Sequence, residues 1–168
     1  AINNATSTYA SVKVVTYGSP ENGSYHARLF NSSDANAEQY LITPQLSDLA
    51  NGTHRLKFIG KNGGSGEKMV LGTMSDTQDA TTFTLIDTIE LTSSEVEYMY
   101  NLTQVTSDMH IAFHHVANSS TDRIYIDNVI WEPIPSCLNS TLLNSQNITT
   151  ISVGLNWNNP SLASEFII

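Results

Sequence analysis

Residues Lys68–Leu91 read KMVLGTMSDTQDATTFTLIDTIEL, and their pattern indicates the fold class of the chain. An apolar run, Met69–Met74, precedes a polar, acidic segment and a second apolar run, Phe83–Leu91. Apolar and polar residues alternate along the second run, which is the period of a strand with one buried face. The stretch therefore predicts two strands joined by an acidic loop.

Asp87 interrupts this alternation. Phe83, Leu85, Ile89 and Leu91 share one parity and are expected on the buried face, yet the charged Asp87 falls among them. Either a β-bulge shifts the register by one residue, or a partner draws Asp87 inward. The bulge is the favoured interpretation, because a one-residue shift exchanges the two faces.

The rest of the first 132 residues repeats the strand pattern. Short runs rich in strand-forming residues are separated by turn residues, and none shows a sustained apolar stripe of helical period. This predicts an all-β fold, an antiparallel jelly-roll β-sandwich over residues 1–132. The further runs are Ser11–Tyr17, Tyr25–Phe30, Tyr40–Pro44, Thr53–Gly60, Val96–Leu102, Met109–Phe113 and Ile124–Trp131.

The composition changes at Glu132–Cys137. Two prolines within three residues predict a short, stiff linker over residues 133–137. Beyond it, Ile151–Trp157 alternates as a strand does, but the remaining ~30 residues bury too little surface to fold alone. We expect residues 138–168 to be the front of a second, truncated β-sandwich.

Composition and charge argue against several classes of protein. The net charge of −9 leaves little positive charge for a phosphate backbone, so no nucleic-acid partner is expected. The single cysteine argues against an intramolecular disulfide and a cysteine-based zinc site. No apolar run is long enough to span a bilayer, so no membrane insertion is expected, and the first residues lack the pattern of a signal peptide.

No motif predicts catalysis. Gly63–Glu67 lacks the last glycine of a nucleophile elbow, and no helix pattern follows it. Glu95 and Glu97 could resemble the carboxylate pair of a glycosidase, but their two-residue spacing is more typical of a solvated strand face. We therefore expect a protein that is not an enzyme.

Calcium (Ca²⁺) is the metal that the sequence favours. His114 and His115 would point to opposite faces of a strand, which argues against a transition-metal site. Carboxylates in loops and at strand ends provide the oxygen ligands that a hard cation requires. The candidate ligands are Asp34, Asp76 and Asp127, each of which could equally cap backbone amides.

Five segments carry motifs in a fixed order: YLITPQL (Tyr40–Leu46), HRLKF (His54–Phe58), VLGTMSD (Val70–Asp76), TFTLID (Thr82–Asp87) and RIYIDNV (Arg123–Val129). Together they resemble the cleaved-adhesin, or choice-of-anchor J, domains over about residues 24–132. These are MAM-like jelly rolls of secreted and surface-anchored bacterial proteins, including the adhesin regions of gingipains. The resemblance implies a secreted or cell-surface location and structural calcium near the chain ends, with Asp127 the first candidate.

SVGLNW, at Ser152–Trp157, is similar to the tryptophan-bearing second strand of a fibronectin type III module. Members of the resembled family commonly place the two modules in tandem. They also open with an additional strand that carries acidic and aromatic residues, and nothing before Ser11 matches it. Either the front has diverged or the chain begins inside the domain.

These observations predict a non-catalytic recognition or adhesion module within a larger bacterial protein. Its partner would be a glycan or a host or surface protein, besides neighbouring domains of the same polypeptide. Alternatives are a structural spacer in a multidomain secreted enzyme, or a subunit of a surface assembly. Tyr25 and Trp131 are the candidate ligand-binding aromatics, although each could instead be buried in the core.

Overall fold

The computed structural model describes residues 1–17, 20–64, 67–103, 107–116, 121–135, 141–146, 149–152 and 154–158. It divides into two compact units, Ala1–Pro133 and Ile134–Ile168. We refer to the first unit as the body and to the second as the tail. In the described part of the chain, no helix is both long and apolar enough to cross a membrane.

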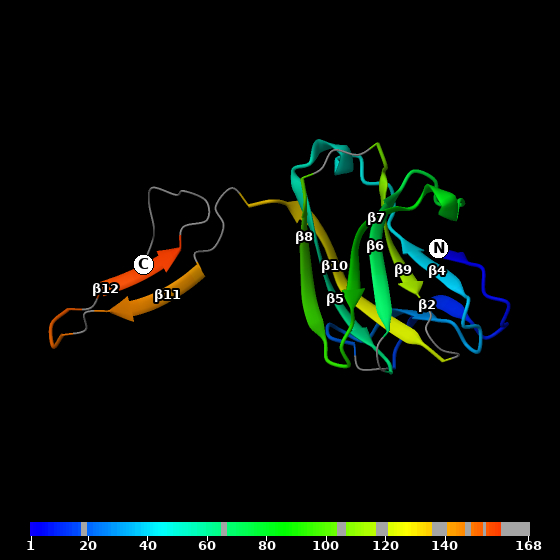
Figure 1. Ribbon diagram of the computed structural model, residues 1–168, viewed down its shortest axis with the longest axis horizontal. Coiled ribbons are helices and arrows are strands. Elements are labelled where there is room, and N and C mark those ends of the chain that lie inside the picture. Colours follow the sequence, from blue (N-terminus) through cyan, green and yellow to red (C-terminus); the bar gives the residue numbers. More distant parts are fainter. Residues whose placement is uncertain are drawn as a thin grey trace. The chain divides into compact units, whose positions relative to one another are not determined.

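The body consists of two antiparallel sheets of five strands each (Figure 1). The first sheet has the order β1-β4-β9-β6-β7 and the second β2-β3-β10-β5-β8, which confirms the predicted antiparallel sandwich. The strands of the first sheet are β1 (Ile2–Asn3), β4 (Glu38–Ile42), β9 (His110–Val116), β6 (Lys68–Met74) and β7 (Thr84–Glu90). Those of the second are β2 (Ser11–Val15), β3 (His26–Phe30), β10 (Arg123–Pro133), β5 (His54–Asn62) and β8 (Val96–Leu102). Two short 3-10 helices, Leu49–Asn51 and Ala80–Thr82, lie in loops.

The core lies between the sheets and is built by the alternation of each strand. Phe58 of β5 meets Phe113 of β9 edge-on, with ring centroids 5.0 Å apart at an angle of 80°. Tyr98 and Tyr100 of β8 stack beside Phe58. Such aromatic pairs stabilise a core beyond the area that they bury. The other fully buried apolar side chains include Leu29, Leu49, Leu56, Met69, Leu71, Ile111, Ile124 and Ile126.

The interruption at Asp87 coincides with a bulge, the favoured cause, whereas Asp87 has a partner but stays exposed. Leu71 pairs with Asp87 and the next residue, Gly72, pairs with Leu85, so β7 carries a bulge. Asp87 also has a partner, because its Oδ2 accepts a hydrogen bond from the Tyr100 hydroxyl at 2.7 Å. The bulge changes the side to which the strand's apolar residues point, and Leu85 is 60% exposed. The expectation that Leu85 is buried was therefore wrong.

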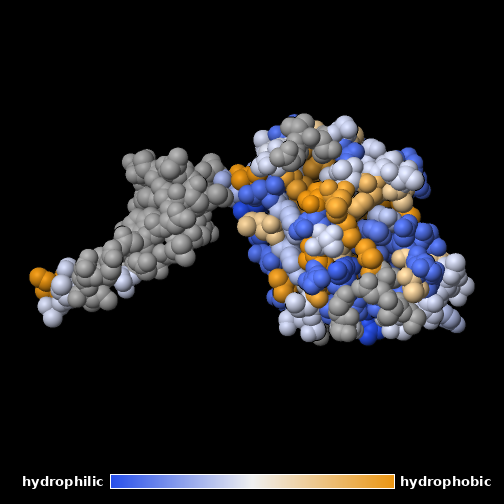
Figure 2. Space-filling view, in the orientation of Figure 1, coloured by the Kyte–Doolittle hydropathy of each residue, from blue (hydrophilic) through white to orange (hydrophobic). Residues whose placement is uncertain are grey.

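This bulged strand is the edge of the first sheet, and it contributes to the apolar surface of the body. Leu85 and Ile86 are both exposed on β7. Figure 2 shows apolar surface over this strand, between polar regions.

The tail contains a hairpin in its described residues. Strands β11 (Thr141–Gln146) and β12 (Gly154–Asn158) pair antiparallel. The similarity to a fibronectin type III module stays a prediction. Cys137 lies outside the described residues.

Replacing Gly72 with alanine should destabilise the body. An added Cβ would clash with the Phe83 ring and with the backbone oxygen of Thr84, which cannot move without disturbing the bulge. We expect the free energy of unfolding to fall by about 2 kcal/mol, measured by urea denaturation.

Gly23→Ala is the matched control. Gly23 has φ 72° and no atom within 4 Å of an added Cβ, so only backbone strain of about 1 kcal/mol is expected. If Gly72→Ala costs no more than Gly23→Ala, the close approach at the bulge does not constrain the strand.

Candidate functional site

The solvent-facing side of the second sheet, which we term the outer face, collects most of the positive charge. Leu56 and Phe58 of β5 are fully buried, so alternation directs the odd-numbered residues of this strand outward. Of the seven lysines and arginines, only Lys68 lies on a strand of the first sheet, which leaves six on the second. These six are Lys13, Arg28, Arg55, Lys57, Lys61 and Arg123.

Strand register places four outward residues in one row across the sheet. Lys13 of β2 pairs with Arg28 of β3, Arg28 pairs with Tyr125 of β10, and Tyr125 pairs with Lys61 of β5. Neighbouring strands lie about 4.8 Å apart, so the row extends about 14 Å across the face. Arg123 of β10 lies in the adjacent row, two residues from Tyr125.

Only part of this positive charge is neutralised. Three ion pairs join Arg55 to Glu132 (2.6 Å), Lys57 to Glu97 (3.4 Å) and Lys61 to Glu95 (2.5 Å). Within the described part of the chain, none of the ion pairs involves the other three cations. The uncompensated charges are those of Lys13, Arg28 and Arg123.

Arg28 differs from Lys13 in that it is buried and lies between two aromatic rings. It is only 8% exposed, and its guanidinium lies 5.2 Å from the ring centre of Tyr17 and 4.9 Å from that of Phe30. Nη2 donates to Ser11 Oγ at 3.1 Å, whereas the buried Nε has no acceptor in the described structure. A cation–π contact contributes ~0.5–2 kcal/mol, but removing an ion from water costs several kcal/mol. The charge of Arg28 is therefore incompletely compensated.

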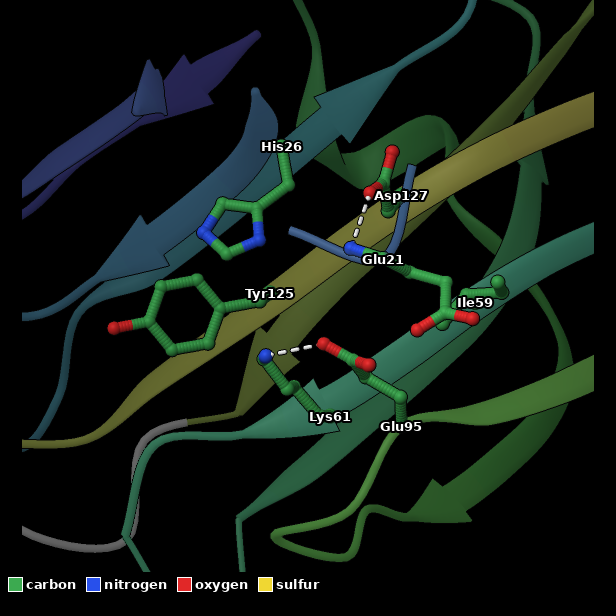
Figure 3. A pocket seen from close by; sticks show the side chains of 7 residues that line it. All are labelled: Glu21, His26, Ile59, Lys61, Glu95, Tyr125 and Asp127. Carbon is green, nitrogen blue, oxygen red and sulfur yellow. Dashed lines mark hydrogen bonds and ion pairs between the residues drawn. The ribbon is translucent and has the colours of Figure 1, made fainter. Parts of the chain in front are cut away.

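A small hollow opens beside this row, at the level of Tyr125 (Figure 3). The His26 and Tyr125 rings pack with centroids 4.5 Å apart, and His26 Nε2 donates to the carbonyl oxygen of Tyr17 at 2.8 Å. Burial lowers the pKa of His26, so the ring is neutral at physiological pH. The residues lining the hollow are Glu21, His26, Ile59, Lys61, Glu95, Tyr125 and Asp127.

Glu21 and Glu95 form an unequal carboxyl pair at the edge of this hollow. Their mutual hydrogen bond is the main cause that raises the pKa of Glu21, and it also lowers the pKa of Glu95. Lys61 lowers the pKa of Glu95 further. Because the carboxyls share a hydrogen bond, the proton of the pair resides on Glu21 as the pH falls.

A second, wider hollow of about 360 Å³ adjoins the first and shares Lys61 and Tyr125 with it. Arg123 also lines it, and its Nη2 donates to the carbonyl oxygen of Gly63 at 3.0 Å. The outer face thus offers adjoining concave, polar surfaces beside the row of Lys13, Arg28, Tyr125 and Lys61. Such a surface suits the binding of a polar ligand.

The predicted calcium ligand Asp127 anchors a loop in the structure. Its Oδ2 accepts hydrogen bonds from the backbone amides of Glu21 (3.0 Å) and Asn22 (3.1 Å). Its Oδ1 accepts one from the amide of Asn128 at 2.7 Å. The carboxylate thereby holds the turn between β2 and β3 against β10.

The other two predicted calcium ligands also cap backbone amides. Asp34 accepts from the Thr6 amide at 2.7 Å and from the Asn36 amide at 3.0 Å, and Asp76 accepts from the Gln78 amide at 2.8 Å. No three His, Cys, Asp or Glu side chains of the described residues converge as metal ligands. These carboxylates therefore do not fit one shared calcium site, and calcium binding stays a prediction.

His114 and His115 of β9 face opposite sides of the strand, as their spacing predicts. His114 stacks on Tyr40 with centroids 4.2 Å apart, whereas His115 faces Gln39, with Nδ1 at 3.3 Å from Oε1. Burial lowers the pKa of His115 to about 4, so this ring is neutral at physiological pH. Both rings have structural roles.

The two predicted ligand-binding aromatics have different environments. Tyr25 is 62% exposed immediately before β3 and is available to a ligand. Trp131 packs against the core, stacks on His54 with centroids 5.1 Å apart, and donates from Nε1 to Asp48 Oδ1 at 2.9 Å. The structure thus gives Trp131 a structural role, and binding by Tyr25 stays a prediction.

Sequence analysis did not single out Tyr17 or Arg28. Tyr17 is 52% exposed over the guanidinium of Arg28. Tyr17 has the parity of Lys13 and Val15, and the meaning of that parity depends on the pairing of β2 with β3.

The fold of the body occurs in known structures. The K2 cleaved adhesin domain of Lys-gingipain superposes with a TM-score of 0.61 at 15% identity, covering 76% of this chain and 87% of that domain. The K1 domain from Porphyromonas gingivalis W83 gives 0.61 at 17% identity, covering 80% and 90%. The body has the fold of the cleaved adhesin domains.

The cleaved-adhesin-like fold is shared with a carbohydrate-binding module. A family 30 carbohydrate-binding module superposes with a TM-score of 0.54 at 13% identity, covering 84% of this chain and 80% of that one. No family model matches the sequence, and comparison with curated proteins finds no match either.

Asp127→Ala should lower the free energy of unfolding by about 2 kcal/mol, because three backbone amides lose a charged acceptor. If the role of Asp127 is only to hold the turn, the loss in urea denaturation will be the same with calcium and with a chelator. Asp76→Ala is the control, with an expected loss below about 1 kcal/mol, since its carboxylate caps one amide of its own loop. A chelator that destabilises the native chain but not Asp127→Ala would instead identify Asp127 as a calcium ligand.

Glu21→Gln should raise the melting temperature at neutral pH. Folding raises the pKa of Glu21, so its protonated form favours the folded state and its ionised form costs stability above that pKa. Glutamine keeps a neutral partner for Glu95, and the gain should vanish below the usual glutamate pKa of 4.5, where Glu21 is protonated. Glu97→Gln, which removes the partner of Lys57, should give no such gain. A gain that is independent of pH would contradict the assigned carboxyl pair.

Proposed function

We propose that the body is a non-catalytic carbohydrate-recognition module of a secreted or cell-surface protein, and that the outer face binds the glycan. The observation that carries this proposal is the half-exposed Tyr17, whose carbonyl oxygen accepts a hydrogen bond from His26, a residue that lines the first of two adjoining polar hollows. An aromatic ring flanked by hydrogen-bonding groups is the usual composition of a sugar-binding surface. The sharing of the fold with a carbohydrate-binding module and with adhesin domains supports the same function.

The carboxylates of the outer face suit binding better than glycoside hydrolysis. A glycosidase needs two carboxyl groups about 5 Å or more apart, so that the scissile bond or a water molecule fits between them. Glu21 and Glu95 instead hydrogen-bond to each other, and Lys61 neutralises Glu95. This arrangement supports recognition of hydroxyl groups without cleavage.

A surface-assembly subunit is the second candidate function, and the edge strand β7 favours it. This strand pairs on one side only, with β6, and carries the exposed Leu85 and Ile86. An apolar, unpaired edge can accept a strand from another protein. In that case a stable protein complex, and no glycan affinity, would be observed.

Tyr17→Ala should weaken glycan binding by roughly tenfold, because it removes the exposed aromatic surface while the sheet below keeps its register. Binding of the native chain and the variants to a panel of neutral and acidic polysaccharides would be measured by affinity electrophoresis. Tyr25→Ala tests whether the second exposed tyrosine also contributes.

Leu85→Ala is the matched control, since it removes an apolar side chain of similar exposure from the other sheet. It should leave glycan binding unchanged. Absence of binding to every polysaccharide, or an equal loss in Leu85→Ala and Tyr17→Ala, would rule out the outer face as a glycan site.

A further inference from the structure

We propose that the outer face selects an acidic saccharide, whose carboxylate or sulfate group binds at Arg28 and Lys13. This inference rests on the proposed function, because it names the chemical class of glycan that the same surface takes. It is carried by the distribution of charge and by the environment of one arginine.

The distribution of charge is uneven for so acidic a chain. Sixteen acidic and seven basic residues give a net charge of −9, yet six of the seven cations lie on the strands of the second sheet. Carboxylates neutralise Arg55, Lys57 and Lys61 toward β8 and the end of β10. Toward β2 and β3, Lys13 and Arg28 lack such partners among the described residues. Asp127 and Glu21 lie near His26 on this side, but neither is in an ion pair with these cations.

Arg28 is the centre of this unneutralised region. More than nine-tenths of the residue is buried, and its Nε has no acceptor in the described structure. The guanidinium is held between two aromatic rings, which orient it but contribute no negative charge. A planar guanidinium that no carboxylate neutralises is the side chain best matched to a carboxylate or sulfate group.

The residues around Arg28 suit an anionic group that is a substituent of a sugar. Tyr17 covers the guanidinium and is half exposed, so a sugar that contacts this ring brings an acidic substituent within reach of Arg28. Lys13 pairs with Arg28 across adjacent strands and provides a second, exposed cation. The same two cations would give a neutral sugar no comparable advantage.

Matched pairs of polymers test the inference with the full chain. Polygalacturonate is compared with its methyl ester, and dextran sulfate is compared with dextran, by affinity electrophoresis and isothermal titration calorimetry. We expect at least one acidic polymer to bind at least tenfold more tightly than its uncharged counterpart, with an affinity that falls as salt is added. The two pairs distinguish a carboxylate ligand from a sulfate ligand.

Two substitutions test the assigned cations. Arg28→Gln should weaken binding of the acidic polymer roughly tenfold or more, and Arg28→Lys should recover only part of it, because lysine lacks the planar fork. Lys13→Gln should weaken binding about threefold and, being exposed, leaves the fold intact even if Arg28→Gln does not fold.

Lys68→Gln is the control, since it removes the same charge from the first sheet. It should leave the affinity unchanged. Equal binding of charged and uncharged polymers would overturn the acidic specificity while leaving the proposed glycan function in place. Binding to no polysaccharide at all would overturn both, and an equal loss in Lys68→Gln and Lys13→Gln would show non-specific attraction instead of a site.

Discussion

The contact between Phe58 and Phe113 is the constraint on which the rest of the body depends. It joins β5, inside the second sheet, to β9, inside the first, with ring centroids 5.0 Å apart. Because Phe58 points inward, alternation along the strand directs the odd-numbered residues of β5 outward. The position of Lys61 beside Tyr125, and therefore the outer face itself, follows from how the core is packed. The same alternation of β5 thus determines which of its residues pack in the core and which form the outer face.

The outer face divides into two electrostatic regions because the carboxylates that form ion pairs with its cations lie toward β8 and the end of β10. Glu95, Glu97 and Glu132 hold the cations of β5 in ion pairs, which gain little stability at a surface but cancel charge locally. Glu21 and Glu95 share a hydrogen bond and Lys61 forms an ion pair with Glu95, so the three groups ionise together. Arg28 lies outside that network, between aromatic rings that restrict its position without neutralising it.

Sequence periodicity was sufficient to predict the fold, but it could not predict which residues lie together on the outer face. Alternation predicts nearly every strand of the body, since burial on one side of a sheet imposes a period of two. It failed at Leu85, because a one-residue bulge reverses the two sides and leaves only a weak trace in the sequence. It could not bring Arg28 next to Tyr125, because that proximity depends on which strands pair across the sheet. The role of Trp131 likewise required the position of Asp48, 83 residues away in the chain.

The fold alone does not determine the ligand of this chain. At 13–17% identity to the adhesin and carbohydrate-binding structures, what is shared is the inward pattern that builds a sandwich, whereas outward residues are free to differ. The charge of −9 also says little about contact with an anion, because charges beyond about 8 Å are screened at physiological ionic strength. A group that reaches Arg28 is therefore governed by its immediate neighbours, which are a lysine, a serine hydroxyl and two aromatic rings. An acidic protein can thus present an anion-selective surface, provided that its carboxylates are paired elsewhere on the same sheet.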